Sequence, residues 1–271
     1  MSETKTDTYF HNPFEKTTCK KCGHRFDSLK PTCPKCKEES DHPRANPLNE
    51  VTFAHPIIEL LLSMWAVYSI VRGNISYLTP TNPNVEPATP EQLMVSNYLI
   101  YGILFIVLVA IASLSLPKLL KSFTKTDCLW GILVCFAIFA FDIVWGNISN
   151  ALGATTNENQ GTVNKIVEVN LPLAILFLSM IGPMCEELTY RVGVFNFTRR
   201  VNRIFGYVVS VLIFGFIHMH DYGNPNEWLS FPSYAFAGLA FAYAYEKWGL
   251  GASFIAHFLV NFLAVLSSYC L

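Results

Sequence analysis

Two adjacent carboxylates and an arginine stand at the end of an apolar stretch that approaches membrane-spanning length. Glu186, Glu187 and Arg191 are adjacent to the uncharged run 171–185. An ionisable group inside a bilayer is costly unless it is paired or functional, so these residues mark a candidate site. Glu187 and Arg191 are four residues apart and can form an ion pair along one helix. Glu186 points about 100° away on that helix, so we expect it to face a cavity instead.

Three further polar residues lie in apolar surroundings downstream. His218 follows the run 214–217, whereas His257 and Asn261 are four residues apart and share one helix face. At 1.5 Å per helical residue, Glu186 and His218 both lie roughly 20 Å from the nearest basic cluster, and His257 and Asn261 roughly 15 to 21 Å. Three helices of alternating direction would therefore bring these groups to one level. This convergence favours a single site over separate polar contacts between helices, although one structural polar cluster stays as an alternative.

The order of these residues resembles the CPBP family, which comprises CAAX prenyl endopeptidases and bacteriocin-processing or immunity proteins. Three motifs carry the resemblance, E-E-x-x-x-R at 186–191, F-x-x-x-H at 214–218 and H-x-x-x-N at 257–261, and it covers about 170 to 265. Tyr190 stands where the family usually has Phe, and Val192 where Gly often follows, but neither change removes a titratable group. The resemblance implies an intramembrane endopeptidase. Its substrate would be a prenylated C-terminus, a bacteriocin precursor or a membrane-protein tail.

The candidate residues could perform this chemistry. Hydrolysis of an amide needs an activated water, a stabilised oxyanion and a proton for the leaving amine. Glu186 with His218 would position and deprotonate the water, and His257 with Asn261 would donate to the oxyanion. Glu187 and Arg191 would fix the orientation of Glu186.

Two alternatives remain: the protein could be a metalloendopeptidase, or it could have no catalytic activity. Two Glu and two His could ligate Zn²⁺ in a metalloendopeptidase, but no H-E-x-x-H pattern places them so, and Asn261 is a poor zinc ligand. We therefore favour glutamate-type, metal-independent chemistry. The chain could instead be a non-catalytic immunity or peptide-binding protein whose N-terminal module recruits a protein partner.

A second cluster, of cysteines, precedes the apolar segments. Two C-x2-C knuckles, ten residues apart, supply four thiolates, which suit tetrahedral Zn²⁺; they are Cys19, Cys22, Cys33 and Cys36. One tight hairpin at 25–30 could close the site. Disulfides or free thiols are the alternatives, but the basic head favours a reducing cytosolic location. The pattern predicts a zinc ribbon whose closed metal site is structural or serves to bind a partner.

Composition predicts the body of the protein. Of 271 residues, 52% are hydrophobic and 14% charged, against about 25% charged in soluble domains, and the formal net charge is -1. These values favour a multi-pass protein of the cell membrane and argue against nucleic-acid binding. We expect an all-α bundle of about seven transmembrane helices, preceded by the small β-hairpin ribbon. The predicted segments are 53–72, 97–117, 128–150, 170–191, 205–220, 232–247 and 249–268.

The predicted organisation has three parts. Residues 1–50 form the ribbon with a linker at 37–50, residues 51–168 form three helices with their loops, and residues 169–271 form the catalytic core. Sixteen Lys and Arg fall on the side of the ribbon, whereas Arg72 and Lys165 fall on the other. Because Lys and Arg concentrate in cytoplasmic loops, the N-terminus is predicted to be cytoplasmic and the C-terminus outside. Cleavage is then expected near the cytoplasmic face.

Overall fold

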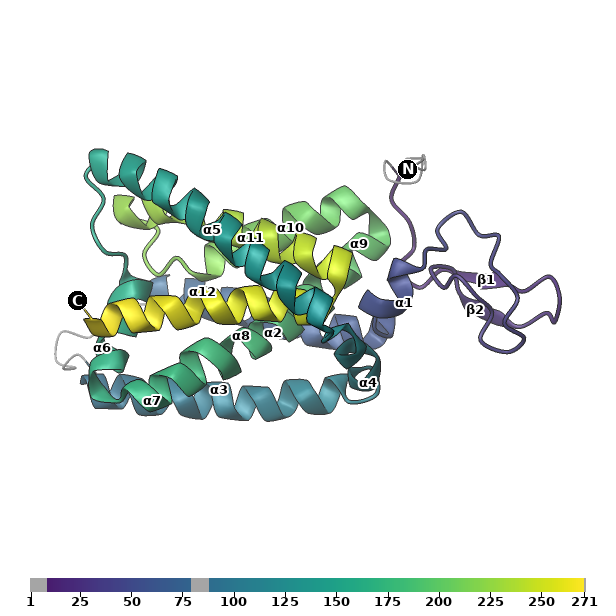
Figure 1. The fold of residues 1–271 in the computed structure, drawn as a ribbon, viewed down its shortest axis with the longest axis horizontal. Helices are drawn as coiled ribbons and strands as arrows, with labels where there is room; N and C mark the ends of the chain where they lie inside the picture. The colour runs from purple at the N-terminus through teal and green to yellow at the C-terminus, as the bar shows by residue number, and fades with distance from the viewer. Residues whose placement is uncertain (1–8, 79–87, 271) are drawn as a thin grey trace.

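The computed structural model describes residues 9–78 and 88–270, with the backbone alone for 70–78. A small two-stranded module lies at one end of a long helical bundle, and the C-terminus lies at the other end with α6 (Figure 1). This arrangement agrees with the predicted class, an all-α membrane body behind a β-hairpin. The elements in chain order are β1 (Lys16–Thr18), β2 (Arg25–Asp27), α1 (Leu48–Thr52), α2 (Pro56–Leu78), α3 (Pro90–Ala112), α4 (Leu116–Leu119), η2 (Leu120–Ser122), α5 (Lys125–Ala151), α6 (Glu158–Val169), α7 (Leu171–Ala174), η3 (Ile175–Ile181), α8 (Gly182–Glu186), η4 (Glu187–Phe195), α9 (Asn196–Val201), α10 (Arg203–Ile217), α11 (Pro225–Trp248) and α12 (Leu250–Cys270).

The N-terminal hairpin is held by pairing and by a very small core. Strands β1 and β2 pair antiparallel, with Thr17 opposite Phe26. Phe26 is buried against Cys19 and Cys33, which lie at the ends of the two knuckles. So few apolar residues stabilise a fold weakly, and small domains of this kind usually need a metal or disulfides. We therefore expect the stability of the hairpin to depend on what its cysteines bind.

Four of the described helices are long and apolar enough to cross a membrane, and the chain is an integral membrane protein. They are Pro90–Ala112, Lys125–Ala151, Leu171–Val201 and Leu250–Cys270. Shorter apolar helices cover Pro56–Ser69 and Arg203–Ile217. The seven predicted apolar segments all coincide with helices, but the count of about seven spans stays a prediction. Of the two outer basic residues, Lys165 is exposed on α6, and the side chain of Arg72 lies outside the described residues.

The helix Leu171–Val201 is irregular where the candidate carboxylates lie. Its segments η3 and η4 have the wider π-helical pattern, and the short α-helix α8 joins them. Pro183 at the start of α8 has no backbone N–H to donate, which weakens regular α-helical pairing there. Widened turns inside α-helices often occur at functional sites because they rotate side chains out of register. Here the second widened segment, η4, begins at Glu187, one residue after Glu186.

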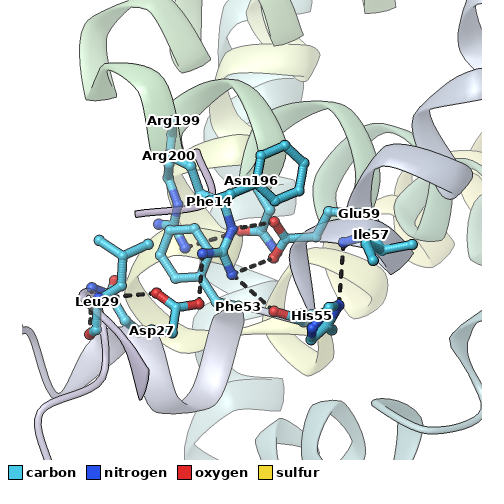
Figure 2. A network of polar contacts seen from close by, with 12 residues as sticks. Phe14, Asp27, Leu29, Phe53, His55, Ile57, Glu59, Asn196, Arg199 and Arg200 are labelled. Atoms are coloured by element: carbon cyan, nitrogen blue, oxygen red, sulfur yellow. Dashed lines mark hydrogen bonds and ion pairs between the residues drawn. The ribbon is translucent and has the colours of Figure 1, made fainter. Parts of the chain in front are cut away.

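A buried arginine joins the ribbon to the bundle (Figure 2). Arg200 of α9 donates from Nε to Glu59 Oε2 of α2 at 2.5 Å and from Nη1 to Asp27 Oδ2 of β2 at 2.8 Å. Its Nη2 donates to the carbonyl of Ala54 at 2.9 Å. Arg44 donates to the Arg200 carbonyl and to Glu15 Oε2, the latter at 2.7 Å. Segment 37–50, predicted as a linker, thus contributes a largely buried side chain to this junction and is not a free tether.

Candidate active site

Glu187 is enclosed by partners from its own helix and from α12. Its side chain is fully buried, and Oε2 lies 3.4 Å from Arg191 Nε. His257 Nδ1 lies 2.9 Å from Glu187 Oε1, and the Ser253 hydroxyl donates to Oε2. Arg191 in turn donates to Ser210 Oγ at 3.0 Å. Both oxygens of Glu187 are therefore occupied, which suits a carboxylate that orients other groups.

Glu186 has the opposite surroundings, although it is the next residue. Its Oε1 accepts a hydrogen bond from the Tyr101 hydroxyl of α3 at 3.3 Å. Its Oε2 has no hydrogen-bond partner among the described residues. The Nε2 atoms of His218 and His257 lie 3.8 and 3.7 Å from this oxygen. One carboxylate oxygen thus faces two imidazole nitrogens beyond direct hydrogen-bond distance, so a donor beside them, off the lines that join these atoms, can contact the oxygen and a nitrogen together.

The hydrogen-bond partners of the two histidines determine their tautomers. His218 Nδ1 lies 2.7 Å from the carbonyl of Phe214, and His257 Nδ1 lies 2.9 Å from Glu187. Carbonyl and carboxylate oxygens only accept, so each Nδ1 carries the hydrogen. In the neutral rings both Nε2 atoms are then acceptors that face Glu186 Oε2. Three acceptors on one point attract a donor such as water, and a second proton on either ring converts that Nε2 into a donor.

The candidate set also borders a cavity of about 240 Å³. Glu186, His218 and Asn261 line it, together with Tyr101 and residues of α6. Asn261 Nδ2 donates one hydrogen to the Leu178 carbonyl at 2.9 Å, which leaves its second hydrogen for a ligand. A further cavity of about 140 Å³ adjoins Glu186 between α2 and α3. Of the six predicted residues, Glu187, Arg191 and His257 line neither cavity, and His257 lies behind Glu186, with its Nε2 3.7 Å from Glu186 Oε2.

Four polar residues of this site were absent from the sequence prediction. Tyr101 binds Glu186, Ser253 binds Glu187, and Ser210 binds Arg191. Tyr234 of α11 stacks on His218 with ring centroids 4.6 Å apart. Ser253 lies four residues before His257, so helical spacing could have suggested it. The other three come from different helices and carry no signal in the sequence.

The donors around Glu186 fit a metal ion poorly. Metal ligands must converge on one point, with about 2.0–2.1 Å from zinc to each imidazole nitrogen. Among the described residues, the four cysteines are the only set of three or more His, Cys, Asp or Glu donor atoms that all lie within 4.8 Å of one another. Glu186, His218 and His257 do not form such a set.

The cysteine cluster has the arrangement that a tetrahedral ion needs. Cys19 Sγ lies 3.5 Å from Cys36 Sγ, and Cys22 Sγ lies 3.7 Å from Cys33 Sγ. Ligands at about 2.3 Å from zinc are about 3.8 Å apart in a tetrahedron, so the spacing matches. Each knuckle closes with a backbone hydrogen bond to its first cysteine carbonyl, from Gly23 and from Lys37. Both residues have positive φ, 67° and 61°, which these tight turns require. The four thiols can therefore hold a metal ion.

Comparisons with known proteins agree with the motifs. Residues 168–263 match the family model described as "Type II CAAX prenyl endopeptidase Rce1-like". The UPF0177 protein YvdC of Lactococcus lactis subsp. lactis (strain IL1403) is 24% identical over 135 residues, 49% of this chain and 49% of that protein. The putative membrane peptidase YdiL of Bacillus subtilis (strain 168) is 24% identical over 190 residues, 69% of this chain and 75% of that protein.

The matches show which part of the chain is similar to known proteins. The matched region 168–263 contains all three motifs, so the resemblance inferred from them is confirmed. The chain spans about half the length of YvdC. No solved structure matches the chain significantly.

Proposed function

We propose that this protein is an intramembrane endopeptidase in which Glu186 activates a water molecule for attack on a peptide bond. The single observation that carries the proposal is the position of Glu186 Oε2, 3.8 and 3.7 Å from the two Nε2 atoms and at the wall of a cavity. The likeness to CAAX prenyl endopeptidases and to a putative membrane peptidase supports the same class of reaction.

The proposed reaction divides the work among the residues. A water between Glu186 and His218 gives a proton to Glu186 while its oxygen attacks the carbonyl carbon. The oxyanion receives a hydrogen bond from Asn261 Nδ2 and from the Nε2–H of a protonated His257. Glu187 stabilises that imidazolium through Nδ1, as a carboxylate does in hydrolytic triads. Glu186 then passes its proton to the leaving amine, which completes the hydrolysis.

The ribbon completes the proposal with a structural metal. Cys19, Cys22, Cys33 and Cys36 would hold Zn²⁺ in a closed site, where it holds the hairpin folded and offers no open position for catalysis. We expect about one zinc per chain, lost when these cysteines are changed. A second zinc that depends on His218 and His257 would contradict the metal-independent mechanism.

Substitutions in the purified protein test the enzyme. Glu186→Gln and His218→Ala should each abolish cleavage of a quenched-fluorescence peptide library, while the apparent melting temperature stays close to that of the wild type. Glu168→Gln is the matched control, because this carboxylate is exposed on α6 and lines neither cavity. Cleavage retained by both variants would contradict the proposal. If Glu186→Gln keeps a cellular phenotype that cysteine variants lose, the non-catalytic binding protein is the correct reading instead.

The side of cleavage is a separate matter. Lysine and arginine counts put the ribbon in the cytoplasm, and the sequence predicts cleavage near that face. The cavity at Glu186 is lined by α6, which lies at the end of the bundle opposite the ribbon.

A further inference from the structure

The cavity at Glu186 runs toward the end of the bundle that is remote from the ribbon. Four residues of α6 form part of its wall, namely Asn159, Thr162, Val163 and Ile166. Helix α6 lies at the end where the C-terminus is found, and the ribbon hairpin lies at the opposite end (Figure 1). His220, which follows α10 on the α6 side of His218, also lines the cavity. A ligand in this cavity therefore extends from Glu186 toward the α6 end.

The path from the ribbon to Glu186 is filled by side chains. Arg191, Phe195 and Tyr245 are among the largest fully buried side chains of the protein, and they follow Glu187 along the direction of the ribbon. Asn196 donates to the Tyr245 hydroxyl at 3.0 Å and to the carbonyl of Thr52 at 2.8 Å, which closes this region further. A peptide cannot reach Glu186 through such a packed core without opening it.

The walls of the cavity suit an uncharged, extended polypeptide. Amide and hydroxyl side chains line it, including Asn97, Asn159, Thr162 and Asn261. Within the described part of the chain, Glu186 is the only carboxylate at this surface, and no lysine or arginine reaches it. Asn97 Oδ1 is buried without a hydrogen-bond partner among the described residues. Such groups pair with backbone N–H and C=O groups of a peptide, because each amide side chain both donates and accepts.

The α6 end is also tied to the candidate catalytic histidine. Asn157 and Asn159 donate to the Tyr234 hydroxyl at 3.3 and 3.1 Å, and Tyr234 stacks on His218. Glu227 accepts from the backbone N–H of Glu158 at 2.9 Å and from that of His220 at 3.0 Å. The α6 end of the cavity is thus held in a defined position relative to His218.

From these observations we infer that the substrate peptide enters from the membrane side opposite the ribbon. With the ribbon in the cytoplasm, the substrate is an unfolded segment on the outer side, such as an exported polypeptide or an external tail of a membrane protein. The inference rests on the proposed function for its chemistry, but the direction of access can be measured without any catalysis.

Cysteine labelling in cells compares the two ends. In a background with Cys128, Cys135, Cys185 and Cys270 changed to Ala, Thr162→Cys probes the cavity and Lys30→Cys probes the exposed ribbon surface. A membrane-impermeant maleimide should label Thr162→Cys in intact cells at least 10-fold above the background chain. Lys30→Cys should react only after the membrane is permeabilised.

Any other labelling result contradicts the inference in whole or in part. Labelling of both variants only after permeabilisation places the entrance on the ribbon side. Thr162→Cys that never reacts, even in detergent, means that the cavity is closed to water. If Lys30→Cys reacts in intact cells and Thr162→Cys does not, the ribbon and the cavity still face opposite sides of the membrane. The ribbon is then outside, so the proposal of an external substrate is refuted.

The inference and the proposed function can fail separately. Glu186→Gln added to Thr162→Cys should leave labelling unchanged, because labelling needs access and no catalysis. If labelling follows the expected pattern but the purified protein cleaves no peptide, the proposed protease activity is refuted and the proposed side of substrate entry is retained. If the purified protein cleaves peptide but both cysteine variants are labelled only after permeabilisation, only the proposed side of substrate entry is refuted.

Discussion

Glu186 and Glu187 differ in their surroundings much more than their adjacency suggests. Glu187 is fully buried and bound to Arg191, His257 and Ser253. Glu186 has one oxygen bound to Tyr101 and the other without a hydrogen-bond partner among the described residues. Removing one partner of a buried ion pair is costly because it leaves an uncompensated charge, whereas changing a group with few partners is not. Substitution of either glutamate should therefore lower activity, but only substitution of Glu187 should lower stability.

Glu187→Gln is expected to destabilise the protein, and Glu186→Gln is not. The first change leaves the Arg191 guanidinium buried without its carboxylate, which costs about 3–5 kcal/mol in comparable buried pairs. The second removes no satisfied ion pair. The apparent melting temperature of the purified proteins measures the difference, and equal losses in both variants would contradict the assignment.

Tyr101→Phe tests whether the hydroxyl of Tyr101 orients Glu186, the carboxylate proposed to activate water. Tyr101 donates to Glu186 Oε1 at 3.3 Å and the ring itself would remain in place. A hydrogen bond to a charged group contributes roughly 1.5 kcal/mol or more, so kcat should fall about tenfold with little change in KM. A shifted pH profile of kcat should accompany the loss. A change confined to melting temperature would indicate a purely structural tyrosine.

At the scale of elements, the helix with the carboxylates depends on close contact with α2. A Cβ added at Gly193 of η4 would lie 2.9 Å from the Ser63 backbone nitrogen and 3.0 Å from Leu62. These atoms belong to the backbone and the first side-chain carbon of α2, so the whole helix must move to make room. The glycine thus permits the approach that holds Glu187 and Arg191 in position.

Gly193→Ala should destabilise the protein by about 1–3 kcal/mol, as overpacked cores do, and should lower activity as well. Gly146→Ala in α5 is the control, because nothing lies within 4 Å of its added Cβ. At that position alanine should be neutral or stabilising by up to about 1 kcal/mol, since glycine is a poor helix former. Melting curves of both variants decide the comparison.

The short helix α4 supplies a lysine whose stability contribution depends on pH. Lys118 donates to the backbone carbonyls of Asn49 and Phe53 beside the ribbon junction. Burial, and then the nearby charge of Lys30, lower the pKa of Lys118 to about 8 from 10.5. Between these values the unfolded chain keeps a proton that the folded chain has released, so stability rises with pH there.

Lys118→Met should remove this rise. Relative to the variant, the wild type should gain about 1–2 kcal/mol between pH 8 and pH 10.5, an amount reduced because the side chain is partly exposed. Unfolding measured at a series of pH values gives the difference curve. Parallel curves for the two proteins would contradict the lowered pKa.

At the scale of the whole molecule, the ribbon is joined to the end of the bundle by a buried arginine. Arg200 connects Asp27 of the hairpin with Glu59 of α2, and it lies on the same helix as Glu187 (Figure 2). The rings of Phe53 and the guanidinium of Arg200 are 4.6 Å apart, which adds a cation–π contact. Loss of the ribbon fold should therefore weaken the end of the helix that carries the carboxylates.

Asp27→Asn should lower the melting temperature of the full chain, because the buried Arg200 charge loses one of its two carboxylate partners. A loss of about 2 kcal/mol is expected for such a site. Asp41→Asn removes an exposed pair with Lys20 and should cause no measurable change. Cys33→Ser, which removes one of the four proposed metal ligands, should resemble Asp27→Asn. A normal melting curve for Cys33→Ser would contradict the coupling.

The sequence by itself determined those features that follow from local geometry. An α-helix has a constant spacing, so the pairing of Glu187 with Arg191 and the shared face of His257 and Asn261 could be predicted from positions four apart. The C-x2-C spacing predicted the cysteine cluster because each knuckle is a tight local turn, and apolar length predicted the membrane helices. These features depend on residues close together in the chain.

Only the tertiary structure decided which partners surround each carboxylate, which helices line the cavity and how the ribbon is fixed. Each depends on side chains that meet from distant helices, such as Tyr101 on Glu186, the α6 residues beside the cavity and Asp27 on Arg200. The spacing of residues within one helix carries no information on which neighbouring helix will face it, because packing and desolvation are properties of the assembled bundle.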